Sequence, residues 1–180
     1  MNLSGDTTMD QVLGAYPGAR RALFRKYHVG GCSSCGFTPD ETLAQLCARN
    51  GNLSVDEVIA HIQSSHEADK QLEIASEEVV ERRTRGEKVR LLDLRTREEW
   101  DAVHLDGAEF VTQDLIQHLM GKEGQEGLLV FYDHSGASSI DAAAYFAGHG
   151  FANARCLRGG IDAWSVEVDP KVRRYKLETA

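Results

Sequence analysis

The chain lacks the features that mark membrane and secreted proteins. Its 180 residues include only three prolines and four cysteines, and aromatic residues make up 7% of it. It has no run of about 18 apolar residues, the length that a helix needs to cross a bilayer. Residues 1–11 have neither the basic start nor the apolar stretch of a signal peptide. We therefore expect a soluble, cytoplasmic protein without a membrane partner.

Positive charge is also scarce. The 20 Lys and Arg residues are outnumbered by 28 Asp and Glu residues, which gives a net charge of −8. Residues 1–70 contribute −2 (6 basic, 8 acidic) and residues 71–180 contribute −6 (14 basic, 20 acidic). Neither part offers the basic face that nucleic acid or anionic lipid requires, so no nucleic-acid partner is expected.

The four cysteines are too few and too unevenly spread for a secreted disulfide scaffold. In a chain without a signal peptide, the close pair Cys32 and Cys35 indicates redox or metal chemistry instead.

Residues 1–66 show helix signals and no strand pattern, so we expect a small all-helical domain there. Thr38, followed by a proline and two acidic residues, combines a helix N-cap with a favourable first turn, which predicts a helix from Thr38 to about Arg49. Ser54 opens a further helix in the same way. Residues 67–71 are polar and without pattern, which predicts a linker.

Residues 72–180 alternate short apolar runs with helical stretches. The runs that we predict as strands are 72–74, 89–95, 109–111, 127–133 and 154–157. The stretches that we predict as helices are 76–85, one opened by Thr96, one near 113–120, and 139–148. This order predicts an α/β domain whose parallel sheet is covered by helices on both faces, with ligands at the carboxyl ends of the strands.

Two separated stretches of this second domain carry a family resemblance. They are LLDLRTREEWDAVHLDGA, residues 91–108, and LRGGIDAW, residues 157–164. With this order and spacing, the chain from about Leu72 to Tyr175 resembles the rhodanese family of sulfurtransferases. The resemblance implies the rhodanese fold and an active loop of the form Cys-x-x-Gly-x-Arg-Ser. In that family the cysteine takes up sulfane sulfur as a persulfide, and the backbone N–H groups of the loop hold the anionic sulfur.

The corresponding loop of this chain departs from the family pattern. The aligned loop residues are Asp133, His134, Ser135, Gly136, Ala137, Ser138 and Ser139. Asp133 falls on the cysteine position and Ser138 on the arginine position, so both the nucleophile and the cation are absent. Because a carboxylate cannot accept sulfur to give a persulfide, we expect this loop to be catalytically inactive and to serve for binding a partner or an anion.

Asp133 admits two interpretations. Its carboxylate could fill the cradle of backbone N–H groups by itself, or it could cap a helix that begins near Ser135. His134 is interpreted as solvent-facing or loop-bracing, since adjacent residues of a tight loop seldom aim at the same substrate atom. Cys156 lies in the predicted last strand and is interpreted as a core residue rather than a substitute nucleophile.

The first domain carries a second resemblance, in YHVGGCSSCGFTPDETL, residues 27–43. With its flanking helical segments, over roughly residues 4–64, it resembles a small helical family of undefined function. That family is known for a proposed redox disulfide and for association with hybrid-cluster proteins. Its motif cysteines correspond to Cys32 and Cys35.

The spacing of Cys32 and Cys35 allows either a disulfide or two thiolate ligands for one metal ion. His28 and Cys47 could complete a four-ligand site, but His28 is better interpreted as a helix C-terminal residue and Cys47 as a core residue. Alternatively, a two-fold homodimer could bring four thiolates together around zinc or an iron–sulfur cluster.

Three functions remain open at this point. The first is a protein of sulfur, redox or iron–sulfur metabolism, with a working Cys32/Cys35 pair and a rhodanese-like domain that binds a protein partner or an anion. The second is an active sulfurtransferase in which Cys32 or Cys35 accepts sulfur. The third is a regulatory or scaffold module without turnover.

Overall fold

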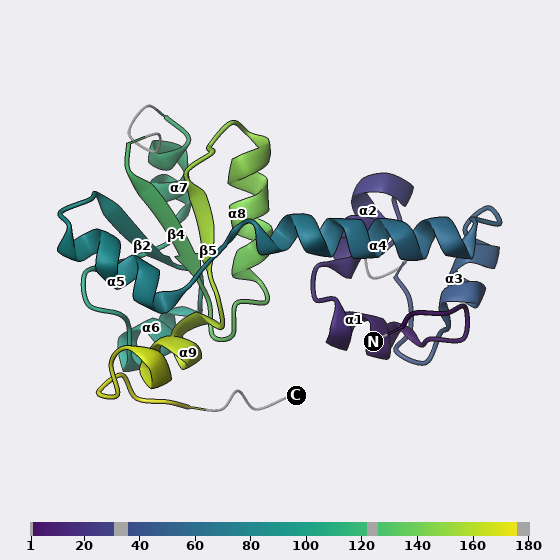
Figure 1. Ribbon diagram of the computed structural model, residues 1–180, viewed down its shortest axis with the longest axis horizontal. Coiled ribbons are helices and arrows are strands. Elements are labelled where there is room, and N and C mark those ends of the chain that lie inside the picture. The colour runs from purple at the N-terminus through teal and green to yellow at the C-terminus, as the bar shows by residue number, and fades with distance from the viewer. Residues whose placement is uncertain (1, 31–35, 122–125, 176–180) are drawn as a thin grey trace. The chain divides into compact units, whose positions relative to one another are not determined.

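The computed structural model describes residues 2–30, 36–121 and 126–175 (Figure 1). Cys32 and Cys35 lie outside these ranges. The chain divides into two compact units, Met1–Gln71 and Leu72–Ala180, which we call the helical unit and the sheet unit.

The helical unit packs its helices around one apolar core. Its helices are α1 (Met9–Ala15), α2 (Ala19–Tyr27), α3 (Leu43–Arg49) and α4 (Val55–Lys70). Fully buried apolar side chains from all four helices make the core; they include Met9, Val12, Leu23, Leu43, Leu46, Val58 and Ile62. Cys47 belongs to this core at 2% exposure, which confirms its interpretation as a core residue.

The helix expected from Thr38 begins later, at Leu43. Thr42 is its N-cap: the Thr42 hydroxyl accepts a hydrogen bond from the Gln45 backbone N (3.3 Å), and the Gln45 side chain accepts one from the Thr42 backbone N (2.9 Å). Thr38 instead starts a tight turn, in which its carbonyl oxygen accepts a hydrogen bond from the Glu41 backbone N. The predicted start was wrong because two threonines compete as caps, and each is followed three residues later by a residue that can complete a capping box, Glu41 or Gln45. The Glu41 side chain binds Arg49 instead, so only Thr42 has a complete capping box.

Residues 67–71, expected as a linker, are the last turn of α4 and its C-cap residue Gln71. The segment contains neither glycine nor proline, so nothing in it ends the helix early. Two ion pairs add to its stability: Asp69 binds Arg21 of α2 at 2.5 Å, and Lys70 binds Glu67 at 2.8 Å. A polar stretch without apolar periodicity was therefore an exposed helix end rather than a linker.

The sheet unit is α/β, as its strand and helix rhythm predicts. Its strands are β1 (Glu73–Ile74), β2 (Val89–Asp93), β3 (Ala108–Phe110), β4 (Leu128–Tyr132) and β5 (Ala154–Leu157). They form one parallel sheet in the order β1-β5-β4-β2-β3. Its helices are α5 (Ser76–Thr84), α6 (Arg97–Ala102), α7 (Gln113–Leu119), α8 (Ser139–Gly148) and α9 (Gly160–Glu167) (Figure 1).

Helices cover both faces of this sheet, and each face has its own apolar core. Side chains of α7 and α8 pack on one face, whereas side chains of α5 and α9 pack on the other. The central strand β4 serves both, because Phe131 belongs to the first core and its neighbour Tyr132 to the second. Tyr132 pairs in register with Asp93 at the end of β2, so the residue after it, Asp133, emerges at the carboxyl edge of the sheet.

Candidate functional site

The loop from Asp133 to Ser138 joins β4 to the start of α8 and turns sharply at Gly136. Gly136 has a φ of +87°, and a Cβ there would lie 3.0 Å from the Gly159 backbone N and 3.1 Å from the Leu157 carbonyl oxygen. Only glycine fits this conformation and this close approach. The backbone of the loop is therefore fixed by its contact with the segment after β5.

The Asp133 carboxylate occupies the centre of this loop. Its Oδ1 accepts a short hydrogen bond from the Gly136 backbone N, and its Oδ2 accepts one from the Ser138 backbone N at 2.6 Å. The Ser139 hydroxyl lies 3.3 Å from Oδ1. Asp133 is 8% exposed. The carboxylate thus takes hydrogen bonds from the N–H groups that would otherwise be available to an external anion.

The alternative interpretation of Asp133 required a helix that begins near Ser135. That helix, α8, begins at Ser139, and its N-cap residue Ser138 has no side-chain cap hydrogen bond. Asp133 therefore acts on the loop rather than as the N-cap of a helix that starts two residues after it.

The first turn of α9 supports the loop from the outside. The Ile161 backbone N donates to the Asp133 carbonyl oxygen at 3.0 Å, and the Asp162 backbone N donates to the His134 carbonyl oxygen at 3.1 Å. Gly160, with a φ of +59°, lies so close that a Cβ there would be 2.5 Å from the Asp133 carbonyl oxygen. The Gly159–Gly160 pair of the LRGGIDAW stretch therefore lets the α9 terminus approach the loop closely.

Cys156 lies in β5 at 1% exposure, which confirms the interpretation as a core residue. The sequence analysis did not anticipate its neighbours. Its Sγ lies 3.3 Å from the Ser139 hydroxyl and 3.6 Å from the Gly136 carbonyl oxygen. A thiol thus lies directly behind the Asp133 loop. The sequence analysis gave no strand order, and this contact depends on it, because β5 lies next to β4, the strand that leads into the loop.

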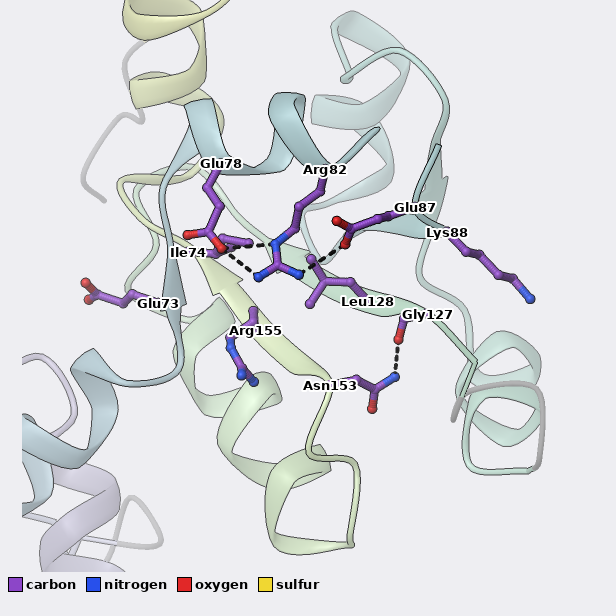
Figure 2. A pocket seen from close by; sticks show the side chains of 10 residues that line it. All are labelled: Glu73, Ile74, Glu78, Arg82, Glu87, Lys88, Gly127, Leu128, Asn153 and Arg155. Carbon is purple, nitrogen blue, oxygen red and sulfur yellow. Dashed lines mark hydrogen bonds and ion pairs between the residues drawn. The ribbon is translucent and has the colours of Figure 1, made fainter. Parts of the chain in front are cut away.

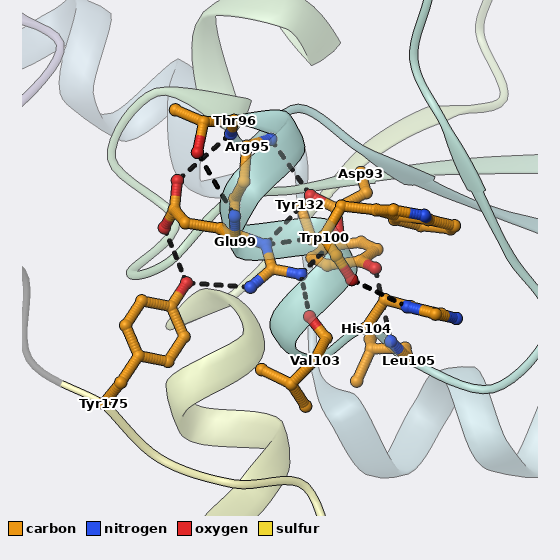
Figure 3. A network of polar contacts seen from close by, with 10 residues as sticks. All are labelled: Asp93, Arg95, Thr96, Glu99, Trp100, Val103, His104, Leu105, Tyr132 and Tyr175. Carbon is orange, nitrogen blue, oxygen red and sulfur yellow. Dashed lines mark hydrogen bonds and ion pairs between the residues drawn. The ribbon is translucent and has the colours of Figure 1, made fainter.

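A buried ion pair lies beside the loop, at the end of β2 (Figure 3). Arg95 and Asp93 are bound at 2.6 Å, with side chains 1% and 0% exposed. The Arg95 guanidinium also donates to the Val103 carbonyl oxygen at 2.7 Å and to the Tyr175 hydroxyl at 2.8 Å. Tyr175 in turn donates to Glu99 at 2.6 Å. The pair therefore has the additional hydrogen bonds that buried charges require.

These contacts shift the pKa values of the network. Burial alone would lower the pKa of Arg95, but the bonds to Asp93 and Tyr175 outweigh it and the pKa is raised. Burial and the bond to Glu99 raise the pKa of Tyr175 to about 12. The burial of Glu99 would raise its pKa, yet the bonds from Tyr175 and Thr96 outweigh that effect and lower it. All three groups are therefore held in their ordinary charge states at neutral pH.

His134 is half-buried against the ring of Tyr175, with the ring centroids 4.7 Å apart. Its Nδ1 atom is buried and has no hydrogen-bond partner among the described residues. Tyr175 follows the last motif that the sequence analysis used, and no pattern there pointed to it. The structure adds it to the site as the residue that connects His134, Arg95 and Glu99.

In the helical unit, two other candidate residues can be placed. His28 is the C-cap of α2 with a left-handed φ of 58°, in agreement with its interpretation as a helix-end residue. Burial raises the pKa of the Cys47 thiol. Within residues 2–30, 36–121 and 126–175, no three His, Cys, Asp or Glu side chains are grouped so that they could hold a metal ion. Over the same ranges, no helix combines the length and the apolar character that crossing a membrane requires.

Comparison with known proteins supports the resemblance of the sheet unit to the rhodanese family. A profile of the rhodanese-like domain matches residues 76–167. Over 92 residues, the chain is 38% identical to the probable adenylyltransferase/sulfurtransferase MoeZ of Mycobacterium tuberculosis. That match covers 50% of this chain but only 24% of the relative, so the matched part of the chain spans about a quarter of the length of MoeZ.

Two shorter relatives are matched over most of their length. The thiosulfate sulfurtransferase GlpE of Shewanella oneidensis is 31% identical over 81 residues, which are 45% of this chain and 80% of the relative. A sulfurtransferase of Allochromatium vinosum is 36% identical over 93 residues, which are 52% of this chain and 87% of the relative.

Proposed function

Since the chain belongs to the rhodanese-like domain family, we propose that it works in sulfur, redox or iron–sulfur metabolism with a rhodanese-like unit that carries no sulfur at the usual loop position. Its relatives include proteins named sulfurtransferases, among them one named for thiosulfate. The sheet unit keeps the framework of such a protein and uses it to bind a partner protein or an anion.

The position of the Asp133 carboxylate carries this proposal. A sulfurtransferase needs a nucleophile that accepts sulfur and an anion cradle that is open to the donor. Here a carboxylate stands in the loop and accepts the hydrogen bonds of Gly136 and Ser138 itself. An incoming thiosulfate dianion would meet a negative charge in place of a nucleophile. Cys156 does not replace it, because its thiol is buried behind the loop.

The working chemistry then falls to Cys32 and Cys35, as a dithiol that closes to a disulfide. This assignment rests on their spacing and on the resemblance of their surroundings to a redox-disulfide family. In this arrangement the sheet unit selects a partner of sulfur or redox metabolism, and the cysteine pair exchanges electrons with it. Two thiols lose two electrons and two protons when the disulfide forms, so the partner must be a two-electron acceptor such as another disulfide.

The proposal is tested by a thiosulfate:cyanide assay, in which sulfur passes from thiosulfate to cyanide and sulfite is released. The full chain with Cys32→Ser and Cys35→Ser should show no turnover above background. Restoring Asp133→Cys in that background should add little activity, and adding Ser138→Arg should help more than either change alone, because the family arginine attracts the donor. Turnover by the Cys32→Ser/Cys35→Ser chain at the level of an ordinary sulfurtransferase would refute an inactive loop.

A further inference from the structure

A second candidate site lies in the helical unit, between α2 and α4. The two helices border a cavity of about 420 Å³. From α2 it is lined by Arg21, Arg25 and Lys26, and from α4 by Ser64, Ser65 and Asp69. Residues four apart share a helix face, as Arg21 and Arg25 do on α2 and Ser65 and Asp69 do on α4, so each helix presents a polar strip to the cavity.

The two strips line the same cavity, and the contacts between the helices run in opposite residue order along α2 and α4, so the helices pack antiparallel. Arg21 binds Asp69 near one end, and the ring Nε2 of His61 lies 3.0 Å from the Ala22 carbonyl oxygen near the middle. Towards the other end, the Tyr27 hydroxyl reaches the carbonyl oxygen of Glu57 in α4. The geometry of the groove is thus fixed by contacts along its whole length.

Positive charge is concentrated in this groove although the chain as a whole is acidic. Four of the six basic residues among residues 1–70 lie in α2. Three of these line the cavity, against a single carboxylate, Asp69, which Arg21 already binds. Within the described residues, Arg25 and Lys26 form no ion pair. The groove therefore carries uncompensated positive charge beside two hydroxyl groups.

The helix dipole explains only part of this pattern. Arg25 and Lys26 lie in the last turn of α2, where the dipole favours cations. Arg21 lies in the first turn, where the dipole disfavours them, and its place is secured instead by Asp69 across the groove. The cations thus follow the cavity rather than the helix termini.

A larger cavity in the sheet unit shows the contrast (Figure 2). It measures about 580 Å³ and is also lined by basic and acidic side chains. There, however, Arg82 binds both Glu78 and Glu87, and Lys88 binds Glu126. Its positive charges are largely neutralised by carboxylates of the same unit, which leaves less attraction for an external anion.

We propose that the α2–α4 groove binds a small molecule that carries a doubly charged oxyanion of the sulfate, thiosulfate or phosphate type. Arg25 and Lys26 supply charge, and the hydroxyls of Ser64 and Ser65 supply neutral donors for the remaining oxygen atoms. The cavity exceeds the volume of the anion itself, so a ligand with an additional organic part also fits. This site is separate from the Asp133 loop and does not depend on the function proposed for that loop.

The test is a titration of the full chain with sulfate, thiosulfate and phosphate at low ionic strength, followed by amide NMR shifts and by calorimetry. Saturable binding of at least one anion is expected, with the shifts at α2 and α4. Arg25→Gln should weaken it by about tenfold or more, because a charge-assisted hydrogen bond is lost. Arg20→Gln is the matched control: it removes the same charge from the same helix, but Arg20 does not line the cavity.

The control should change the affinity by less than about twofold, since an exposed charge outside the groove acts only through a screened field. The inference is overturned if none of the three anions saturates the protein, if Arg20→Gln and Arg25→Gln weaken binding equally, or if the shifts lie in the sheet unit. Thermal melting of both variants shows that a loss of affinity is not a loss of fold.

Discussion

The ring of Tyr175 lies against the ring of His134, with their centroids 4.7 Å apart. His134 belongs to the loop after β4, whereas Tyr175 belongs to the segment that returns after α9. The neighbouring Arg174 anchors that segment by a two-fold hydrogen bond to Asp162 in α9 (2.7 and 2.8 Å). The Tyr175 hydroxyl also contacts Arg95 and Glu99. These bonds hold Tyr175 in the position from which its ring packs against His134 of the loop.

Removal of the Tyr175 hydroxyl should destabilise the protein. Tyr175→Phe keeps the ring on His134 but leaves Arg95 and Glu99 each without one hydrogen bond, which should lower the free energy of unfolding by about 1–3 kcal/mol. Urea denaturation measures this loss in the free energy of unfolding. Tyr145→Phe is the control, since Tyr145 is 53% exposed and its hydroxyl makes no bond within the described residues, so the change should be below about 0.5 kcal/mol. Equal effects would mean that the Tyr175 hydroxyl bonds do not contribute.

Acid should weaken the same network through Glu99. Its pKa is lowered in the folded protein, so its contribution is present above the unfolded value and is lost as pH falls through the folded value. The melting temperature of the wild type should therefore drop more steeply from pH 5 towards pH 3 than that of Glu99→Gln. Glu98→Gln, a change at the exposed neighbouring carboxylate, should keep the steep wild-type profile. If the melting temperatures of all three proteins fell in parallel with pH, Glu99 would not be the group that links stability to pH.

Most of the fold could be predicted, because the local signals of the sheet unit agree with one another. The five apolar runs became the five strands, and Thr96 caps α6 with a complete capping box. The errors lie mainly at helix boundaries, and no helix was predicted after residue 157, where the structure has α9. Thr38 and Thr42 are both plausible N-caps, and residues 67–71 lack apolar periodicity because α4 ends on the surface.

Only the part of the site that lies within the family motifs could be predicted. The loop and its aspartate follow from alignment with a family pattern, whereas the contacts of that aspartate depend on backbone directions that no sequence pattern encodes. Tyr175 was missed because a long-range contact of one side chain leaves no periodic signal. The contact of Cys156 with Ser139 joins residues of β5 and α8 across the loop and depends on strand order and register.

Gly160→Ala should be strongly destabilising. The substitution places a Cβ at a φ of +59° and 2.5 Å from the Asp133 carbonyl oxygen, so either α9 or the loop must move. We expect a loss of at least about 2 kcal/mol in the free energy of unfolding. Gly148→Ala, at the end of α8 with open space around it, should be neutral or stabilising by up to about 1 kcal/mol. Tolerance of Gly160→Ala would show that the loop is not packed on the α9 terminus.

Cys47 and Cys156 should be unreactive in the folded protein. Their exposures are 2% and 1%, and burial raises the pKa of the Cys47 thiol, so little reactive thiolate is available. In the Cys32→Ser/Cys35→Ser chain, a chromogenic disulfide reagent should titrate no thiol under native conditions and two after denaturation. Fast native reaction of one thiol would show that the helical core or the region behind the Asp133 loop opens readily.

Emptying the cradle of its own carboxylate should let an external anion enter. Asp133→Ala frees the backbone N–H groups of Gly136 and Ser138 and removes a negative charge. We expect its affinity for sulfate and thiosulfate to rise at least about tenfold over the parent chain, since charge-assisted hydrogen bonds to the anion replace those to Asp133. Asp133→Asn should gain less, because its amide still fills the space and can accept the bond of one N–H group.

The measurement has to separate this site from the α2–α4 groove. Calorimetry is therefore carried out in the Arg25→Gln background, which weakens the groove, and amide NMR shifts locate the bound anion. Shifts confined to residues 134–139, with the affinity order Ala above Asn above Asp, would support a cradle that Asp133 keeps closed. Unchanged affinity in Asp133→Ala would contradict it, because the N–H groups would then turn away once the carboxylate is gone, and the loop would owe its shape to Asp133 rather than to Gly136 and the α9 terminus.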